Sequence, residues 1–82
     1  MWYVYVLRSR VKEWRYVGFT EDLKKRFREH NEGKSAATKP YKPFVLMSYI
    51  AVKDRQTALQ LEGYFKSGSG IAWMNKHLLP DD

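Results

Sequence analysis

Hydrophobic and polar residues near the start of the chain alternate with a period of two, which is the pattern of β-strands. Residues 2–8 (WYVYVLR) place Trp2, Val4 and Val6 on one face and Tyr3, Tyr5 and Leu7 on the other. Residues 14–19 (WRYVGF) are also rich in aromatic and β-branched side chains, which favour strands. We therefore predict an antiparallel hairpin joined by a polar connection.

The length of that connection decides which residues pair across the hairpin. If it spans residues 9–12, Arg8 pairs with Glu13, and the same register places Tyr5 opposite Tyr16. The two phenols would then be neighbours on one face of the sheet. A connection one residue longer or shorter breaks this arrangement, so the register is a hypothesis.

A helix is predicted directly after the hairpin. Thr20 is its expected N-cap, and the two acidic residues that follow would interact favourably with the helix dipole in the first turn. Leu23 and Phe27 are four residues apart and form an apolar pair, and Gly33 is the expected end of the helix. Residues 33–43 (GKSAATKPYKP) then form a loop rich in Gly, Ser, Lys and Pro.

Residues 44–52 (FVLMSYIAV) predict a third strand, more buried than the first two. Asp54 can cap a second helix, whose apolar stripe consists of Ala58, Leu61 and Phe65. The SGSG sequence at residues 67–70 interrupts this helix, and residues 71–79 predict a short third one. The expected order is β-β-α-β-α-α, an α/β chain of the α+β class in which a small three-stranded antiparallel sheet is flanked by helices.

Composition sets limits on the class of protein. Because the chain has 82 residues, we expect one domain over residues 1–82 with a modest core. The absence of cysteine excludes a disulfide framework and a thiolate zinc site. No apolar run reaches the length of a membrane span, and the first residues lack the layout of a signal peptide. A cytoplasmic location is therefore the expectation.

Charge indicates the kind of partner. The chain carries 15 Lys and Arg against 9 Asp and Glu, a formal net charge of +6, and its sequence pI is about 9.7. Two of the nine acids, Asp81 and Asp82, lie at the C-terminal end, so the rest of the chain is more basic than the total suggests. An excess of positive charge favours polyanionic partners through steering and counterion release. Nucleic acid is therefore a candidate partner.

Several short motifs occur in order along the chain. Y-V-Y occupies residues 3–5 and Y-V-G occupies residues 16–18, within the stretch YVGFTEDLKKRFREHN, and EGYFKSGSG follows later. This ordered set resembles the GIY-YIG nuclease superfamily, and in particular its short stand-alone bacterial members, over nearly the whole chain. No single triplet is specific, whereas the complete set at these spacings is strong evidence.

The resemblance implies a site that hydrolyses phosphodiester bonds. The two tyrosines of the family fall on Tyr5 and Tyr16, its helical arginine on Arg26, a later helical position on His30 and its metal-binding glutamate on Glu62. By resemblance, Tyr16 takes a proton from the attacking water, Arg26 grips the scissile phosphate, and Tyr5 and His30 orient or share the proton transfer. Glu62 would hold one divalent ion, Mg²⁺ or Mn²⁺, which completes its shell with water and substrate oxygens. A phenol, with an ordinary pKa near 10, needs nearby cations to act as a base.

Each of these residues also has an ordinary structural interpretation. The tyrosines can be strand aromatics, and Arg26 can be one cation of a solvated helix face. His30, near a helix C-terminus, would interact favourably with the dipole if it were protonated. Glu62 can pair with Lys66, four residues later on the same helix. Because four independent coincidences at the family's spacing are less plausible than one active site, we prefer the joint interpretation.

Three positions differ from the pattern of the family or match it loosely. Tyr3 replaces the glycine of the name motif, and Phe19 stands where the excision-repair branch has a lysine. Asn75 is the candidate for the asparagine that follows the glutamate in the family. We expect no appended DNA-binding domain of the kind that homing and repair members use to choose their targets.

The basic loop at residues 33–43 is the predicted rim of a nucleic-acid surface. The candidate contacts there are Lys34, Lys39 and Lys42 for backbone phosphates and Tyr41 for stacking on a base, with Lys66 and Asn75 as further candidates. The alternative is that the loop residues only keep a proline-containing loop soluble.

The leading prediction is a metal-dependent DNA endonuclease that acts by one-metal hydrolysis. One alternative is a non-catalytic nucleic-acid-binding module that keeps the same fold. A second alternative is an interaction domain that docks on a DNA repair complex through Trp2, Trp14 or Trp73, if those side chains are exposed.

Overall fold

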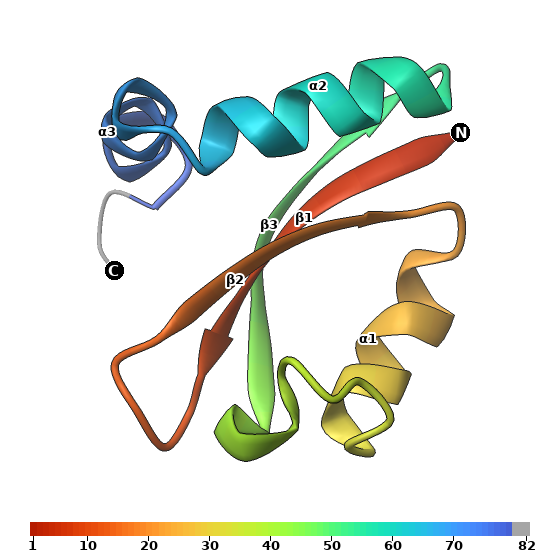
Figure 1. Cartoon of the computed structure of the whole chain (residues 1–82), viewed down its shortest axis with the longest axis vertical. Helices are drawn as coiled ribbons and strands as arrows, with labels where there is room; N and C mark the ends of the chain where they lie inside the picture. The colour runs from red at the N-terminus through yellow and green to blue at the C-terminus, as the bar shows by residue number, and fades with distance from the viewer. Residues whose placement is uncertain (80–82) are drawn as a thin grey trace.

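The computed structural model describes residues 1–79, which form three strands and three α-helices (Figure 1). The strands are β1 (Trp2–Ser9), β2 (Arg15–Thr20) and β3 (Phe44–Val52), the α-helices are α1 (Leu23–Asn31), α2 (Arg55–Phe65) and α3 (Gly68–His77), and a short 3₁₀-helix, η1, covers Lys39–Tyr41. This order confirms the predicted β-β-α-β-α-α arrangement and the α+β class. Within the described part of the chain, no helix has the length and apolar character that a membrane crossing requires.

Strand β1 is the centre of an antiparallel sheet in the order β2-β1-β3. Residues 4–7 are all buried, because β1 has a strand on each side and helices on both faces. Strand β3 pairs with β1 alone, and of its nine residues only Phe44 is buried. The expectation that the third strand is more buried than the first two is therefore wrong. The apolar residues of β3 therefore lie in an edge strand.

The hairpin of β1 and β2 pairs two residues away from the predicted register. Tyr5 lies opposite Gly18, Tyr16 opposite Leu7 and Arg8 opposite Arg15. The predicted pairs Tyr5–Tyr16 and Arg8–Glu13 are therefore wrong, because the connection is longer than residues 9–12 and ends only at Trp14, whose carbonyl accepts a hydrogen bond from the amide of Ser9 (2.9 Å). A shift of two residues leaves every side chain on its original face. The two phenols consequently still share one face of the sheet.

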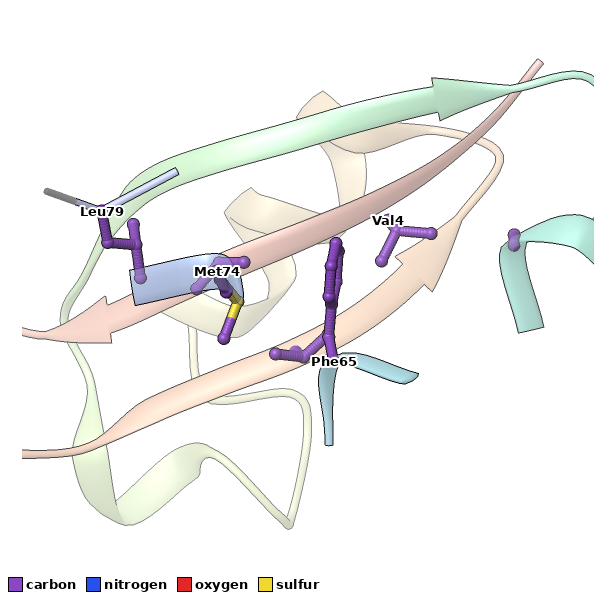
Figure 2. Close-up of a cluster of buried hydrophobic side chains, with 7 residues drawn as sticks. Val4, Phe65, Met74 and Leu79 are labelled. Atoms are coloured by element: carbon purple, nitrogen blue, oxygen red, sulfur yellow. The ribbon is translucent and has the colours of Figure 1, made fainter. Parts of the chain in front are cut away.

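Helices cover both faces of the sheet, α1 and η1 one of them and α2 and α3 the other (Figure 1). On the first face, Leu23 and Phe27 of α1 pack against a cluster of Tyr5, Leu7 and Phe44. On the second face, the buried cluster consists of Val4, Val6, Val17, Ala58, Phe65, Met74 and Leu79 (Figure 2). The apolar stripes predicted for the first two helices are confirmed, because each stripe contacts one of these clusters.

The ends of α1 follow from its local sequence. Asp22, and not Thr20, is the N-cap, and its carboxylate accepts a hydrogen bond from the amide of Lys25 (3.1 Å). The two acidic residues thus lie before the helix and not in its first turn. The helix ends at Asn31 with Glu32 as its C-cap, and Gly33, the predicted stop, follows with a φ of 79° in the left-handed region that glycine adopts without strain.

The turn between α2 and α3 depends on a close approach at Gly70. Helix α3 begins at Gly68, earlier than the predicted residue 71, because the side chain of Ser67 caps it by accepting from the amide of Gly70 (3.1 Å). A Cβ atom at Gly70 would overlap the carbonyl of Tyr64, the last turn of α2. The absence of a side chain therefore lets α3 pack tightly against the end of α2.

The close approach at Gly70 predicts a stability effect. Gly70→Ala should lower the free energy of unfolding by about 1–3 kcal/mol or more, because the backbone must move to admit the methyl group. Urea denaturation measures this. Gly68→Ala is the matched control, since a Cβ at Gly68 meets nothing within 4 Å, and it should leave stability unchanged or slightly raised. Equal destabilisation by both substitutions would contradict the packing explanation.

Candidate functional site

The two tyrosines of the hairpin lie diagonally across β1 and β2. Their ring centroids are 6.3 Å apart, and the geometry depends on Gly18, the residue opposite Tyr5. A Cβ at Gly18 would lie 2.5 Å from the Tyr5 hydroxyl oxygen and 2.9 Å from the Tyr16 ring. Glycine at this position therefore leaves the space that both phenol rings occupy, with Tyr5 buried and Tyr16 half-buried.

His30 of α1 holds the Tyr5 hydroxyl in place. The imidazole is fully buried, with Nε2 2.8 Å from the Tyr5 hydroxyl and Nδ1 2.7 Å from the hydroxyl of Thr38. The guanidinium of Arg26 also hydrogen-bonds to the Tyr5 oxygen and can only donate. A neutral imidazole carries one proton, so one of its two ring nitrogens donates and the other accepts, and the tautomer decides which of Tyr5 and Thr38 is the acceptor.

Burial alters the proton affinities of both groups in this hydrogen-bonded chain. Burial raises the pKa of the Tyr5 hydroxyl to about 12, against the opposing effect of the hydrogen bond from Arg26. Burial, followed by the positive charge of Arg26, lowers the pKa of His30 to about 4. His30 is therefore neutral near pH 7, and the interpretation as a protonated histidine at a helix C-terminus is wrong.

Arg26 lies one turn before His30 and is partly exposed. Its Nη1 atom is 3.3 Å from the carboxylate of Glu29, which is three residues later on α1. Although burial opposes it, the hydrogen bonds and charges of Tyr5 and Glu29 raise the pKa of Arg26. The guanidinium is thus a fixed positive charge beside the Tyr5 hydroxyl.

Glu62 is the carboxylate that α2 contributes to the site. Its side chain is 17% exposed, and its Oε2 atom lies 3.5 Å from the ammonium of Lys66. This contact confirms the predicted i, i+4 ion pair. The charge of Glu62 also reaches Tyr5, where it contributes to the raised pKa of the hydroxyl. The Lys66 ammonium in turn lies 5.8 Å from the centroid of the Tyr16 ring.

The donor set at Glu62 fits one kind of metal ion. Within residues 1–79, no group of three or more His, Cys, Asp or Glu side chains is placed to hold a metal ion. A single mostly buried carboxylate suits a hard cation such as Mg²⁺, which keeps several waters and takes further ligands from a substrate. It does not suit an ion that requires a closed shell of protein ligands.

The other predicted nucleic-acid contacts come from the loop before β3 and from α3. Lys34, Lys39 and Lys42 are exposed in the loop before β3. Tyr41 is half-buried, and its ring stacks on Trp14 with centroids 3.8 Å apart, so at least one of its faces is covered. Asn75 of α3 accepts a hydrogen bond from Nη1 of Arg15 (2.6 Å) and thereby ties α3 to β2.

Sequence reasoning missed two residues on which the site geometry depends. Thr38, in the loop assigned to phosphate contacts, is fully buried and forms a hydrogen bond with His30. No spacing rule indicates this, although the large majority of buried polar side-chain atoms have a hydrogen-bond partner. Gly18 was noted only as part of Y-V-G, whereas its lack of a side chain is what admits the Tyr5 ring.

Comparison with known proteins shows what the chain is similar to. The family model of the GIY-YIG catalytic domain matches residues 1–75. The UPF0213 protein YazA of Bacillus subtilis (strain 168) is 38% identical over 65 residues, which are 78% of this chain and 65% of that protein. The UPF0213 protein SpyM3_1077 of Streptococcus pyogenes serotype M3 is 40% identical over 65 residues, 78% of this chain and 70% of that protein. The chain thus spans less than two thirds of the length of the Bacillus protein. No solved structure matches it significantly.

The buried imidazole predicts a pH dependence of stability. The pKa of His30 is about 4 in the folded protein, below about 6.5 for an ordinary histidine, so the unfolded state binds a proton first as the pH falls. The free energy of unfolding should therefore decrease by about 2 kcal/mol from pH 7.5 to pH 5, measured by urea denaturation. This contribution is fully present above pH 6.5 and is lost as the pH falls towards 4.

Two glutamine variants separate His30 from the other histidine. His77 is exposed on α3 and has no part in this chain of hydrogen bonds, so His77→Gln should keep the full decrease. His30→Gln should be less stable at pH 7.5 but should lose most of the decrease between pH 7.5 and pH 5. An unchanged decrease in His30→Gln would show that another group is responsible.

Proposed function

The chain belongs to the GIY-YIG family, and on this basis we propose that it is an endonuclease that hydrolyses phosphodiester bonds of DNA with one divalent cation. The family identifies a nuclease-type domain, and such a domain implies DNA binding. The observation that carries the proposal is that side chains from β1, β2 and α1 gather around the Tyr5 hydroxyl, on which the charge of Glu62 from α2 also acts. They bring a phenol, a guanidinium, a neutral imidazole and a carboxylate into one small region.

The two phenols are suited to different roles. Tyr5 is 2% exposed, and the pKa of its hydroxyl is raised to about 12, so it is a poor base and serves to orient its neighbours. Tyr16 is half-buried and lies at the outer strand of the sheet, where a substrate can reach it. Tyr16 would therefore take the proton of the attacking water, as geometry requires of a general base.

The charged groups divide the remaining tasks. Arg26 would bind the scissile phosphate, because a guanidinium offers paired donors that match phosphoryl oxygens. Glu62 would hold the cation, Mg²⁺ or Mn²⁺, which supplies charge stabilisation at the phosphoryl and leaving oxygens when it is bound. His30 would keep the Tyr5 hydroxyl aligned through its neutral Nε2.

The basic loop extends the proposed DNA surface beyond the site. Lys34, Lys39 and Lys42 are exposed there and would contact backbone phosphates without reading sequence. Tyr41 would stabilise the loop through its stack on Trp14, and its proposed stacking on a base is limited to a ring face that Trp14 leaves uncovered. Asn75 would act through Arg15, which it holds by a hydrogen bond.

Removal of the proposed base should abolish most cleavage. Tyr16→Phe should lower the rate of cleavage of a labelled DNA in the presence of Mg²⁺ by about 10²- to 10⁴-fold, the usual contribution of general acid–base catalysis. Tyr49→Phe is the matched control, because Tyr49 is an exposed tyrosine of β3, the edge strand on the other side of β1 from Tyr16, so it should retain the parent rate. Equal rates for the two variants would contradict the role of Tyr16.

Substitution of Glu62 tests whether its carboxylate holds the cation that cleavage requires. Glu62→Gln should reduce cleavage to the level that the parent shows in a chelator, while it binds DNA at least as tightly, because it removes one negative charge near the phosphate. Glu21→Gln, at an exposed position before α1, should behave as the parent. Tight and salt-sensitive DNA binding without cleavage by the parent, under any divalent metal, would favour the non-catalytic binding module.

A further inference from the structure

The connection between β1 and β2 forms a hairpin tip (residues 9–13) that is fastened to the loop before β3. The hydroxyl of Ser9, which is buried, donates a hydrogen bond to the carbonyl of Tyr41 (2.6 Å). The amide of Arg10 donates to the carbonyl of Pro43 (2.9 Å). Figure 1 shows the connection and η1 at the same end of the sheet. The hairpin tip and the loop therefore form one continuous surface.

This surface carries positive charge that the neighbouring side chains do not neutralise. Four of its basic side chains are exposed, and within residues 1–79 they contact no carboxylate. These residues are Arg10, Lys12, Lys39 and Lys42. The hairpin tip and the loop at residues 33–43 contain one acid, Glu13. Most of the positive charge therefore remains for a polyanionic partner, which it would attract over a distance.

The aromatic rings beside the hairpin tip are already in contact with side chains of the protein itself. Tyr41 stacks on Trp14 with centroids 3.8 Å apart, and the ammonium of Lys12 lies over the Tyr41 ring, 5.2 Å from its centroid. Proteins that prefer single strands stack successive bases on free aromatic rings. The surface therefore suits the phosphates of a nucleic-acid backbone and offers little to unpaired bases.

The same aromatic side chains connect the hairpin tip to the proposed site. The Trp14 ring contacts Tyr41 on one hand and Tyr16 on the other, and its centroid is 6.0 Å from that of Tyr16. Tyr16 is the residue proposed to act on the attacking water. A DNA backbone that reaches Tyr16 would therefore pass close to the hairpin tip.

From these features, and resting on the proposed endonuclease function, we propose that the hairpin tip binds the phosphate backbone of duplex DNA beside the cleavage site, with Arg10 and Lys12 as the contacts. A duplex carries about one negative charge per 1.7 Å of its axis, twice the density of a single strand, so a surface that acts through charge alone favours the duplex. Because Ser9 holds the hairpin tip in place before DNA binds, little conformational freedom is lost on binding. The contact strengthens and orients binding but reads no sequence.

The salt dependence of DNA binding tests the proposal without cleavage. The affinity of the parent and of the double variant Arg10→Gln/Lys12→Gln for a labelled duplex is measured in a chelator at several salt concentrations. Each lost phosphate contact should reduce the slope of log affinity against log salt by about 0.9, so the double variant should lose about 1.8. The advantage of the parent should accordingly shrink about 10-fold from 50 to 200 mM salt. An unchanged slope would overturn the proposal.

Two control variants locate the effect. Lys24→Gln/Lys53→Gln also removes two exposed positive charges, but Lys24 lies beside Tyr49 of β3 and Lys53 follows β3 at the opposite end of the sheet from the hairpin tip (Figure 1), so the parental slope should be retained. Arg10→Lys/Lys12→Arg keeps both charges and should also retain it. Equal losses of slope in the two glutamine variants would overturn the assignment to the hairpin tip. Circular dichroism confirms that each variant is folded.

The two proposals fail in different ways. If the slope falls as expected but the parent cleaves no DNA with any divalent metal, the assignment of the hairpin tip stands and the endonuclease proposal fails. If the parent cleaves DNA and the Arg10→Gln/Lys12→Gln variant binds it as the parent does, the assignment of the hairpin tip fails alone. Tighter binding of the parent to single-stranded DNA of the same length would overturn the choice of a duplex. Displacement of the duplex by polyglutamate at equal charge would overturn the choice of a nucleic acid over an acidic protein.

Discussion

The hydrogen bond between the Tyr5 hydroxyl and His30 Nε2 is the interaction on which the arrangement of the site depends. It joins the central strand to α1 at a fully buried position, and the other nitrogen of the ring extends the connection to Thr38 in the following loop. A buried polar group without a partner costs about 1–3 kcal/mol, so each of these three side chains requires the next as its hydrogen-bond partner. Strand, helix and loop are thereby held in a single arrangement around one phenol.

The sheet separates the polar side chains of the site from most of the apolar core. The face that carries Tyr5 and Tyr16 packs against α1 and contains the polar chain, whereas the opposite face packs against α2 and α3 through aliphatic and aromatic side chains. Lys66, at the end of α2, is an exception because its ammonium lies over the Tyr16 ring of β2, and Glu62 is another because it pairs with Lys66. A small domain can in this way keep a hydrophobic core although one of its faces is committed to polar groups.

The fold and the set of site residues could be predicted from the sequence, whereas the pairing and the supporting contacts could not. Alternation with a period of two identified both strands of the hairpin. Although the predicted register was wrong, the predicted faces are right, because a shift of two residues leaves each side chain on the same face. The burial of β3 was misjudged, since composition does not distinguish a central strand from an edge strand. Thr38 escaped notice because its role is set by a histidine eight residues away and by the path of the loop.

The close contact of Tyr5 with Gly18 links the variation of two positions. The phenol ring fills the volume that any side chain at Gly18 would need, and the Tyr16 ring closes the remaining side. A larger residue at position 18 is compatible with this backbone only if position 5 becomes smaller, which removes the phenol as well. The tyrosine of the first motif therefore requires the glycine of the second, which couples the two halves of the hairpin sterically.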